Sequence, residues 1–301
     1  MRYNVQKDEL QFIYTSLIFW CGKETVMKFT SDLHIHTHLS SCGKPEATVE
    51  YYMDKARELG LKTLGFTDHM WDSAIPGASK WYTPQNFEHI SQLRAELDAA
   101  DKTGVDRVLF GAECEYDAKG HGVAVSPAVA EQLDVLLVPN SHTHMTVVMP
   151  REYYQPRRHA EYMLEAFYDI LNSEVSRYVT AIPHPFAAVN CEKYPPHYPA
   201  AYPLHSISDD EFKRCFALAA RKGIALEINP YNYRRAPVED IESDELCRER
   251  IRMYRIAKSE GCLFTVGVDA HGIGYHDYYH LIEPVAELIG ITEIDLHPLA
   301  R

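Results

Sequence analysis

Short runs of β-branched and apolar residues alternate along the chain with longer stretches in which apolar residues recur with the period of a helix. The short runs predict strands over residues 28–36, 62–69, 107–113, 134–142, 178–184, 224–229 and 263–271. The stretches between them predict helices over residues 48–59, 84–102, 151–172, 209–222 and 244–260. Strands that alternate with helices are typical of a parallel sheet, so the pattern predicts an α/β fold.

Some segments stand outside this alternation. Residues 194–203 and 231–237 are rich in proline, tyrosine or both, and predict long loops. Residues 1–26 precede the first strong strand and contain an apolar run over residues 12–21. That run is too short to cross a membrane, and no signal-peptide cleavage site follows it. We interpret residues 1–26 as an N-terminal extension and residues 27–301 as one domain.

The composition narrows the class of protein. The 301 residues are 46% hydrophobic and 24% charged, as in an ordinary globular domain. A net charge of −13 would repel a phosphate backbone, so nucleic acid is not an expected partner. The seven cysteines are odd in number, scattered and without a CxxC pair, which is typical of free thiols in a reducing compartment. We therefore expect a cytoplasmic protein without a membrane partner.

Residues of metal-ligand type stand at the ends of nearly all the predicted strands. They are His34, His36, His69, Glu113, His142, His184, Asp269 and His271. In a barrel the carboxyl ends of parallel strands converge on one face, so these side chains would share a single site. The pairs separated by one residue, such as His34 and His36, lie on the same face of their strand. Imidazole and carboxylate ligands suit Zn, Mn or Fe, and eight of them exceed the needs of one tetrahedral ion, which predicts a multinuclear centre.

The residues around these ligands form motifs in a fixed order. The motifs are Asp-Leu-His-Ile-His-Thr at residues 32–37 with Ser40, Thr-Asp-His at 67–69, Gly-Ala-Glu at 111–113, Ser-His at 141–142, Pro-His-Pro at 183–185 and Gly-Val-Asp-Ala-His at 267–271. Taken together they resemble the motifs of the polymerase and histidinol phosphatase (PHP) family. Each motif alone is weak, but the ordered set is highly specific and extends over nearly the whole chain after the extension.

The resemblance implies a distorted seven-stranded (β/α)7 barrel with a centre of three metal ions. The implied ligand sets are His34, His36, Glu113 and Asp269 for one ion, Glu113, His142 and His184 for a second, and His69 with His271 for a third. The chain departs from the family at Cys42, where members with three ions often carry a histidine. Cys42 is either a thiolate ligand or a buried free cysteine, and His38 is an alternative ligand for the third ion.

The resemblance also implies hydrolysis of a small phosphomonoester by a metal-activated hydroxide, at a centre of two or three ions. Histidinol phosphate is the best-known small substrate of stand-alone members. Glu113, Asp269 and His271 are the expected catalytic residues, because divalent ions held there would activate water and stabilise charge on the phosphoryl oxygens. Asp269, His271 and His144 are all candidates for the proton donor to the leaving group.

A phosphate substrate also favours a cation that can bind two of its oxygens. Arg234 and Arg235 follow the strand over residues 224–229 and are either such a clamp or a solvated basic turn. The tyrosines of the predicted loops could stack on an aromatic leaving group. These tyrosines are Tyr194, Tyr198, Tyr202, Tyr231 and Tyr233.

Other functions remain open at this stage. An amidohydrolase-type enzyme also opens with a His-x-His pair and closes with an aspartate, but no lysine stands at a mid-barrel strand end to bridge its ions, and Glu113 suits the phosphatase. A non-catalytic metal-binding module of the same family is the third alternative, which the complete ligand set disfavours. Nucleotide and sugar phosphates fit the same ligands, and the native metal and the oligomeric state stay open.

Overall fold

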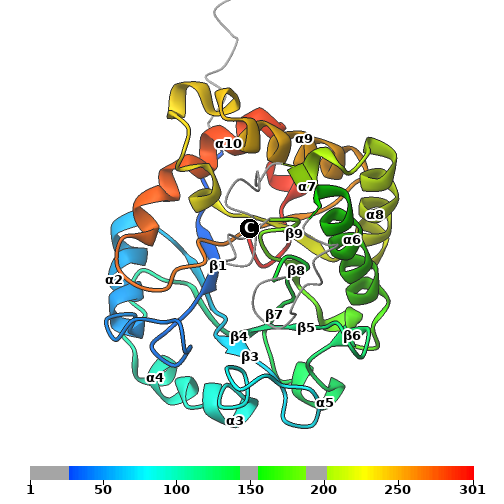
Figure 1. Ribbon diagram of the computed structural model, residues 1–301. Coiled ribbons are helices and arrows are strands. Elements are labelled where there is room, and N and C mark those ends of the chain that lie inside the picture. The colour runs from blue at the N-terminus through cyan, green and yellow to red at the C-terminus, as the bar shows by residue number, and fades with distance from the viewer. Residues whose placement is uncertain (1–26, 143–154, 188–201) are drawn as a thin grey trace, which may run out of the picture.

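The structure is a computed structural model that describes residues 27–142, 155–187 and 202–301. Seven parallel strands stand side by side in the order in which they occur in the sequence. Figure 1 looks along the barrel that they form, with the helices arranged around the outside. The strands are β1 (Ser31–Ile35), β2 (Thr63–Phe66), β4 (Arg107–Cys114), β7 (Val135–Leu137), β8 (Ala181–Ile182), β9 (Ala225–Ile228) and β10 (Phe264–Val266).

The barrel closes between its first strand and the segment that follows its last strand. Ile35 of β1 forms a parallel bridge with Ala270. The backbone N–H of His36 donates to the carbonyl of Ala270 at 2.9 Å, and that of Asp269 donates to the carbonyl of His34 at 2.9 Å. The register between β1 and β2 also shifts between Asp32 and Ile35. The predicted distorted seven-stranded barrel is therefore confirmed.

Helices lie between successive strands, as the alternating pattern predicts. They are α2 (Val49–Leu59), α3 (Phe87–Ile90), α4 (Leu93–Ala99), α5 (Pro127–Ala130), α6 (Pro156–Asn172), α7 (Tyr202–His205), α8 (Asp209–Lys222), α9 (Glu245–Ser259) and α10 (Ile282–Ile289). The 3-10 turns are η2 (Ser176–Tyr178), η3 (Pro230–Tyr233), η4 (Val238–Ser243), η5 (Tyr275–Leu281) and η6 (Glu293–Asp295). Three short strands complete the structure: β3 (His69–Met70), which pairs with β4, and β5 (Tyr116–Asp117) with β6 (Gly122–Val123), which form a hairpin.

Local signals fix the ends of the main helices. The side chain of Thr48 accepts a hydrogen bond from the N–H of Tyr51 at the start of α2. Ser208 and Glu211 form a reciprocal capping box at the start of α8. The same helix ends at Gly223, whose φ of 71° lies in the left-handed region that glycine adopts without strain. These bounds agree closely with the sequence prediction.

The predicted helix over residues 84–102 is wrong, because two shorter helices, α3 and α4, occupy that stretch. Asn86 caps the first of them by accepting from the N–H of His89. The hydrogen bonds then tighten to a three-residue spacing at Gln92, whose N–H donates to the carbonyl of His89. The hydroxyl of Ser91 bonds back to the carbonyl of Phe87 at 2.6 Å, which favours the break.

Some sequence predictions fall outside the described residues. They concern the extension over residues 1–26, the first four residues of the predicted helix over 151–172, and most of the loop over 194–203. None of the helices in the described ranges is long and apolar enough to cross a membrane.

Candidate metal centre

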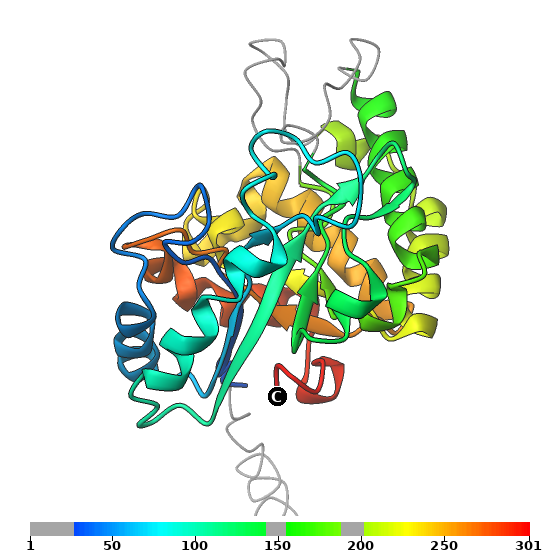
Figure 2. The ribbon, with the colours of Figure 1, turned by 90° about the horizontal axis from the view of Figure 1, so that it is seen from below.

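The eight predicted ligands gather at the carboxyl ends of the strands. His34 and His36 lie at the end of β1, His69 in β3 and Glu113 near the end of β4. The other four follow strands: His142 after β7, His184 after β8, and Asp269 and His271 after β10. Figure 2 shows the barrel from the side, with the loop between β3 and α3, in cyan, above this end and the C-terminus at the other.

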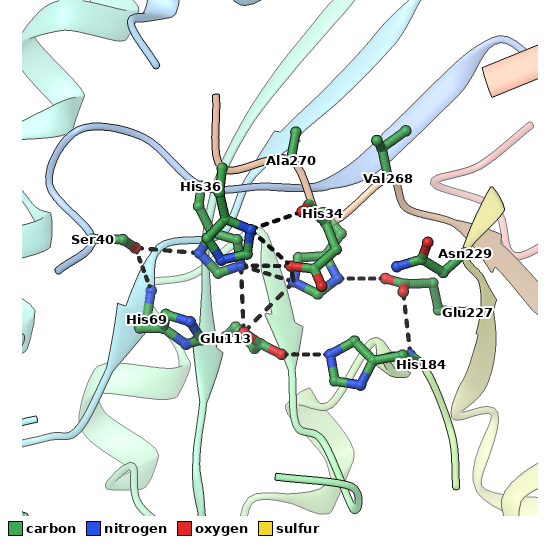
Figure 3. A network of polar contacts seen from close by, with 12 residues as sticks. His34, His36, Ser40, His69, Glu113, His184, Glu227, Asn229, Val268 and Ala270 are labelled. Atoms are coloured by element: carbon green, nitrogen blue, oxygen red, sulfur yellow. Dashed lines mark hydrogen bonds and ion pairs between the residues drawn. The ribbon is translucent and has the colours of Figure 1, made fainter. Parts of the chain in front are cut away.

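Glu113 lies at the middle of the cluster, with histidines around both of its oxygens (Figure 3). Its Oε2 lies 3.0 Å from Nδ1 of His69, 3.4 Å from Nε2 of His36 and 3.6 Å from Nε2 of His34. Its Oε1 lies 3.1 Å from Nε2 of His184 and 3.5 Å from Nε2 of His142. The carboxylate is only 1% exposed. A buried carboxylate that faces five imidazoles is placed to bridge cations held on its two sides.

Asp269 and His271 complete the side of the cluster nearest to solvent. Oδ1 of Asp269 lies 3.1 Å from Nε2 of His36 and 3.4 Å from Nε2 of His34. The ring of His271 stacks on that of His36 at 4.3 Å, and its Nδ1 donates to the carbonyl of Asp269 at 2.9 Å. The Asp269 side chain is 29% exposed and that of His271 19%, whereas His34 is fully buried. The Asp269 side is therefore the part of the cluster that is open to solvent.

Two residues of the cluster have backbone conformations that carry strain. The φ angle of Asp269 is 58° and that of His184 is 30°, in or near the left-handed region that non-glycine residues rarely adopt. Each is fixed by a backbone hydrogen bond, from the Asp269 N–H to the carbonyl of His34 and from the His184 N–H to Oε1 of Glu227 at 3.2 Å. The surrounding barrel thus holds both side chains toward Glu113.

Hydrogen bonds to Nδ1 orient four of the histidines. The Nδ1 partners are Glu227 for His34 at 2.7 Å, Ser40 for His36 at 3.2 Å, Ser141 for His184 at 2.8 Å and Glu115 for His142 at 3.1 Å. A carboxylate can only accept, so Nδ1 of His34 and of His142 carries the proton. Nε2 then faces Glu113, and on loss of its proton to an incoming cation it has the arrangement of a histidine that binds a metal.

The sequence analysis did not select Glu115 or Glu227. Both are nearly fully buried, and Glu227 also accepts from the His184 backbone. Glu115 stands two residues after Glu113 and Glu227 lies at a strand end, which is the only signal that the sequence offers. With 43 Asp and Glu residues in the chain, that signal does not separate them from carboxylates on the surface.

Gly267 provides the space for the contact between His34 and Glu227. A Cβ at this position would lie 2.3 Å from Oε2 of Glu227 and 2.5 Å from Cβ of His34. Both distances are shorter than any real carbon contact, so the pair can form only beside glycine. Gly267, in the last motif, therefore leaves the space in which His34, in the first motif, contacts Glu227.

The carboxylates of the centre hold positive charge on several histidines. Burial opposes the charged form of His142, but Glu113 and Glu115 outweigh it and raise its pKa to about 9. The pKa values of His34 and His36 are also raised, because nearby carboxylates exceed the cost of burial. The pKa of Glu113 is lowered despite its burial, chiefly by the charges of His142 and His69. A cation that binds at such a site would displace protons from these histidines.

The donor set fits divalent ions. Three groups within the centre have ligand atoms that all lie within 4.8 Å of one another: His34, His36 and Asp269; His34, Glu113 and His184; and His36, His69 and His271. Moreover, Nδ1 of His69 and Oε2 of Glu113 are buried and have no hydrogen-bond partner in the described part of the chain. These two atoms lie 3.0 Å apart without the geometry of a hydrogen bond. An ion between them would satisfy both.

The residues proposed as ligands of the third ion have different surroundings. His36, His69 and His271 come together, whereas Cys42, like His142, belongs to none of the ligand groups found in the described ranges. Its thiol is partly buried, and burial with the charges of Glu113 and Asp269 raises its pKa. His38 instead faces Glu96, with Nε2 3.4 Å from Oε1. Cys42 as a ligand stays a prediction.

The two arginines predicted to bind substrate have different partners. Arg234 stacks on the ring of Tyr231 at 3.7 Å, and Tyr231 stacks on Tyr275 at 5.2 Å. The ring of Tyr275 lies 5.7 Å from that of His271, so this stack leads from Arg234 to the open side of the centre. Arg235 is 61% exposed, and its Nε lies 3.9 Å from Oδ2 of Asp244. His144, a candidate proton donor, lies outside the described residues.

Comparison with known proteins adds a family and a fold. The family model of the PHP domain matches residues 32–230. The motif at 267–271 lies beyond that match, although the structure brings its Asp269 and His271 to the same cluster. A comparison with curated proteins gave no match.

Two crystal structures share the fold at low sequence identity. One is histidinol phosphate phosphatase from Lactococcus lactis in complex with zinc, L-histidinol and phosphate, with a TM-score of 0.59 and 19% identity over 89% of this chain and 94% of that one. The other is from Listeria monocytogenes and described as a histidinol phosphatase, with a TM-score of 0.56 and 15% identity over 82% of this chain and 99% of that one. At such low identities the likeness shows a shared fold alone.

Proposed function

The chain belongs to the PHP domain family, whose model matches residues 32–230, and from this premise we propose that it is a metal-dependent phosphatase of small phosphomonoesters. The observation that carries the proposal is the position of Glu113, whose two oxygens face histidines on opposite sides. Such a bridging carboxylate suits neighbouring cations, which phosphoester hydrolysis uses to stabilise charge on both the attacking and the leaving oxygen.

The residues of the centre would hold two or three divalent ions such as Zn, Mn or Fe. Bound ions of this kind supply a hydroxide from water near neutral pH and neutralise charge on phosphoryl oxygens. The role of the protein is to hold the ligand atoms in position. Hydrogen bonds to Nδ1 hold the rings of His34 and His36 in place, and the exposed edge of Asp269 leaves room for the substrate.

We further propose that Arg234 binds the phosphate of the substrate. The stack of Arg234, Tyr231 and Tyr275 ends beside His271, at the open side of the centre. The guanidinium stands at the outer end of this stack, beyond Tyr231 and Tyr275, and would supply the cation that a phosphate needs beyond the metal ions. The tyrosine rings offer apolar faces to the leaving group, which suits an aromatic alcohol such as histidinol.

Replacing Arg234 with alanine is expected to raise KM for a phosphomonoester about tenfold or more, with a smaller change in kcat. The reason is that a hydrogen bond to a charged group contributes about 1.5–3 kcal/mol. Steady-state kinetics on an aryl phosphate measure both constants. Arg235→Ala is the matched control, because Arg235 faces Asp244 and should leave KM nearly unchanged. Equal effects of the two substitutions would argue against a role for Arg234 at the phosphate.

The proposed function is tested by metal analysis together with an activity assay. Protein purified without chelator should contain two or three divalent ions per chain. It should release phosphate from an aryl phosphate after addition of Mn or Zn, and histidinol phosphate, sugar phosphates and nucleotides then define the substrate. Bound metal without hydrolysis of any phosphoester would contradict the proposal and favour the amidohydrolase-type or the non-catalytic alternative.

A further inference from the structure

Glu115 is a buried carboxylate just beyond the end of β4, on the side of Glu113 that faces His142. Its Oε2 accepts from Nδ1 of His142 at 3.1 Å and from the hydroxyl of Tyr82 at 2.6 Å. We infer that Glu115 is a positioning residue, held by Tyr82, which fixes His142 with Nε2 toward Glu113. This inference rests on the proposed function, since it assigns a role within the same centre.

The contacts of Glu115 leave it no other evident task. In the described part of the chain, His142 is its only ion-pair partner, and no lysine or arginine lies within ion-pair distance. A buried carboxylate without such a partner is costly unless its oxygens are hydrogen-bonded. Both oxygens of Glu115 are occupied, because the N–H of Tyr116 lies 3.2 Å from Oε1. The geometry of the three donors therefore fixes the carboxylate, and the carboxylate fixes the imidazole.

Tyr82 links this arrangement to a second ligand. It lies in the loop between β3 and α3, and its side chain is fully buried. Its ring meets the ring of His69 edge-on at 6.0 Å, while its hydroxyl donates to Glu115. His69 and His142 lie at opposite oxygens of Glu113. One tyrosine thus contacts a ligand on one side of Glu113 and supports a ligand on the other.

Three donors converge on Glu115, so replacement with glutamine, which has nearly the same shape, tests the need for two acceptor oxygens. A carboxylate accepts at both oxygens, whereas a carboxamide accepts at one and donates at the other. Whichever way the amide turns, its NH2 group would face either the Tyr116 N–H or the donors of Tyr82 and His142. In the first orientation the amide oxygen still accepts from Tyr82 and His142, but without the charge of a carboxylate, and in the second the NH2 group faces both donors. Glu115→Gln is therefore expected to weaken the hold on His142 in either orientation. Loss of such an outer partner typically weakens metal binding about 10- to 100-fold.

Asp72 provides a control of the same design. It is 3% exposed, and its two oxygens accept from the N–H of Ala74 and from the N–H and hydroxyl of Ser126. None of these donors belongs to the centre, yet Asp72 begins the same loop that carries Tyr82. Asp72→Asn removes one acceptor from three donors, as Glu115→Gln does, and so reports the structural cost alone.

The test measures zinc affinity of the full chain in competition with a chromophoric chelator, with zinc stoichiometry and thermal unfolding recorded in parallel. We expect Glu115→Gln to bind one zinc ion about 10- to 100-fold more weakly than the wild-type protein does. Tyr82→Phe should bind the same ion a few-fold more weakly. Asp72→Asn should keep the wild-type affinity. If phosphatase activity is present, kcat of Glu115→Gln should fall with KM little changed.

Each outcome decides the inference. Wild-type zinc affinity in Glu115→Gln, or an equal loss in Asp72→Asn, would overturn it. Should Glu115→Gln fail to fold, Tyr82→Phe decides instead, and an unchanged affinity in that variant overturns the inference. Wild-type protein that binds zinc but hydrolyses no phosphoester would defeat the proposed function and leave the positioning role measurable. Wild-type protein that binds no zinc would overturn both.

Discussion

Glu113→Gln is expected to lose kcat/KM for a phosphomonoester by well over about 100-fold, the upper end of the usual effect of an outer partner. Glu113 faces histidines with both oxygens, so an amide NH2 would meet imidazole nitrogens on one side whichever way it turns. It would also remove the negative charge that the buried cluster needs to hold cations. Steady-state kinetics and metal analysis of the purified variant measure both losses.

Glu131→Gln is a suitable control for this substitution, because Glu131 is an exposed glutamate at the end of α5, away from the cluster. It should retain wild-type metal content and activity. A Glu113→Gln protein with the full set of ions and near-normal turnover would show that Glu113 does not bridge the centre.

Removal of the ions with a chelator is expected to abolish hydrolysis and to lower the thermal stability of the chain. An ion that binds only the folded state stabilises it by about 2.7 kcal/mol when its free concentration is 100 times the dissociation constant. Without ions, Glu113 and the buried histidines face one another across unsatisfied atoms such as Nδ1 of His69. Thermal unfolding before and after chelation, followed by addition of Zn or Mn, measures the effect.

The control for damage by the chelator is the addition of the ion, which should restore both the activity and the melting temperature. A melting temperature that does not respond to chelation, in protein shown to have lost its metal, would mean that the cluster is stable by its own hydrogen bonds.

The pattern along the sequence was sufficient to predict the parallel α/β architecture and the gathering of eight residues of metal-ligand type, whereas the closed seven-stranded form came from the resemblance to the PHP family. Parallel strands bring their carboxyl ends together, so a ligand at the end of each strand is enough to predict a shared site. The spacing of His34 and His36 also fixed their common direction, because side chains on a strand alternate with a period of two. These features depend on the alternation of side chains along a strand and on the convergence of parallel strand ends.

The residues that support the ligands could not be predicted in this way. Glu227 meets His34 across 193 positions of the chain, and Glu115 meets His142 across 27. Such pairs depend on how the barrel curves and on space such as that beside Gly267, which no periodicity reveals. The same is true of Arg234 and Arg235, because their different partners are set by the turn η3 and by the start of α9. The break between α3 and α4 likewise follows from hydrogen bonds of Ser91, which a helical pattern does not show.

The closure of the barrel has a consequence for synthesis of the protein on the ribosome. The backbone N–H of Val268 donates to Asp32, 236 positions earlier, and Ala270 bridges Ile35. A nascent chain therefore carries its first two ligands long before Asp269 and His271 are translated. It can neither seal the barrel nor assemble the whole centre until its last strand has left the exit tunnel. The complete set of candidate ligands thus exists only in a chain translated through residue 271, and a fragment that ends earlier lacks both the seal and two of these residues.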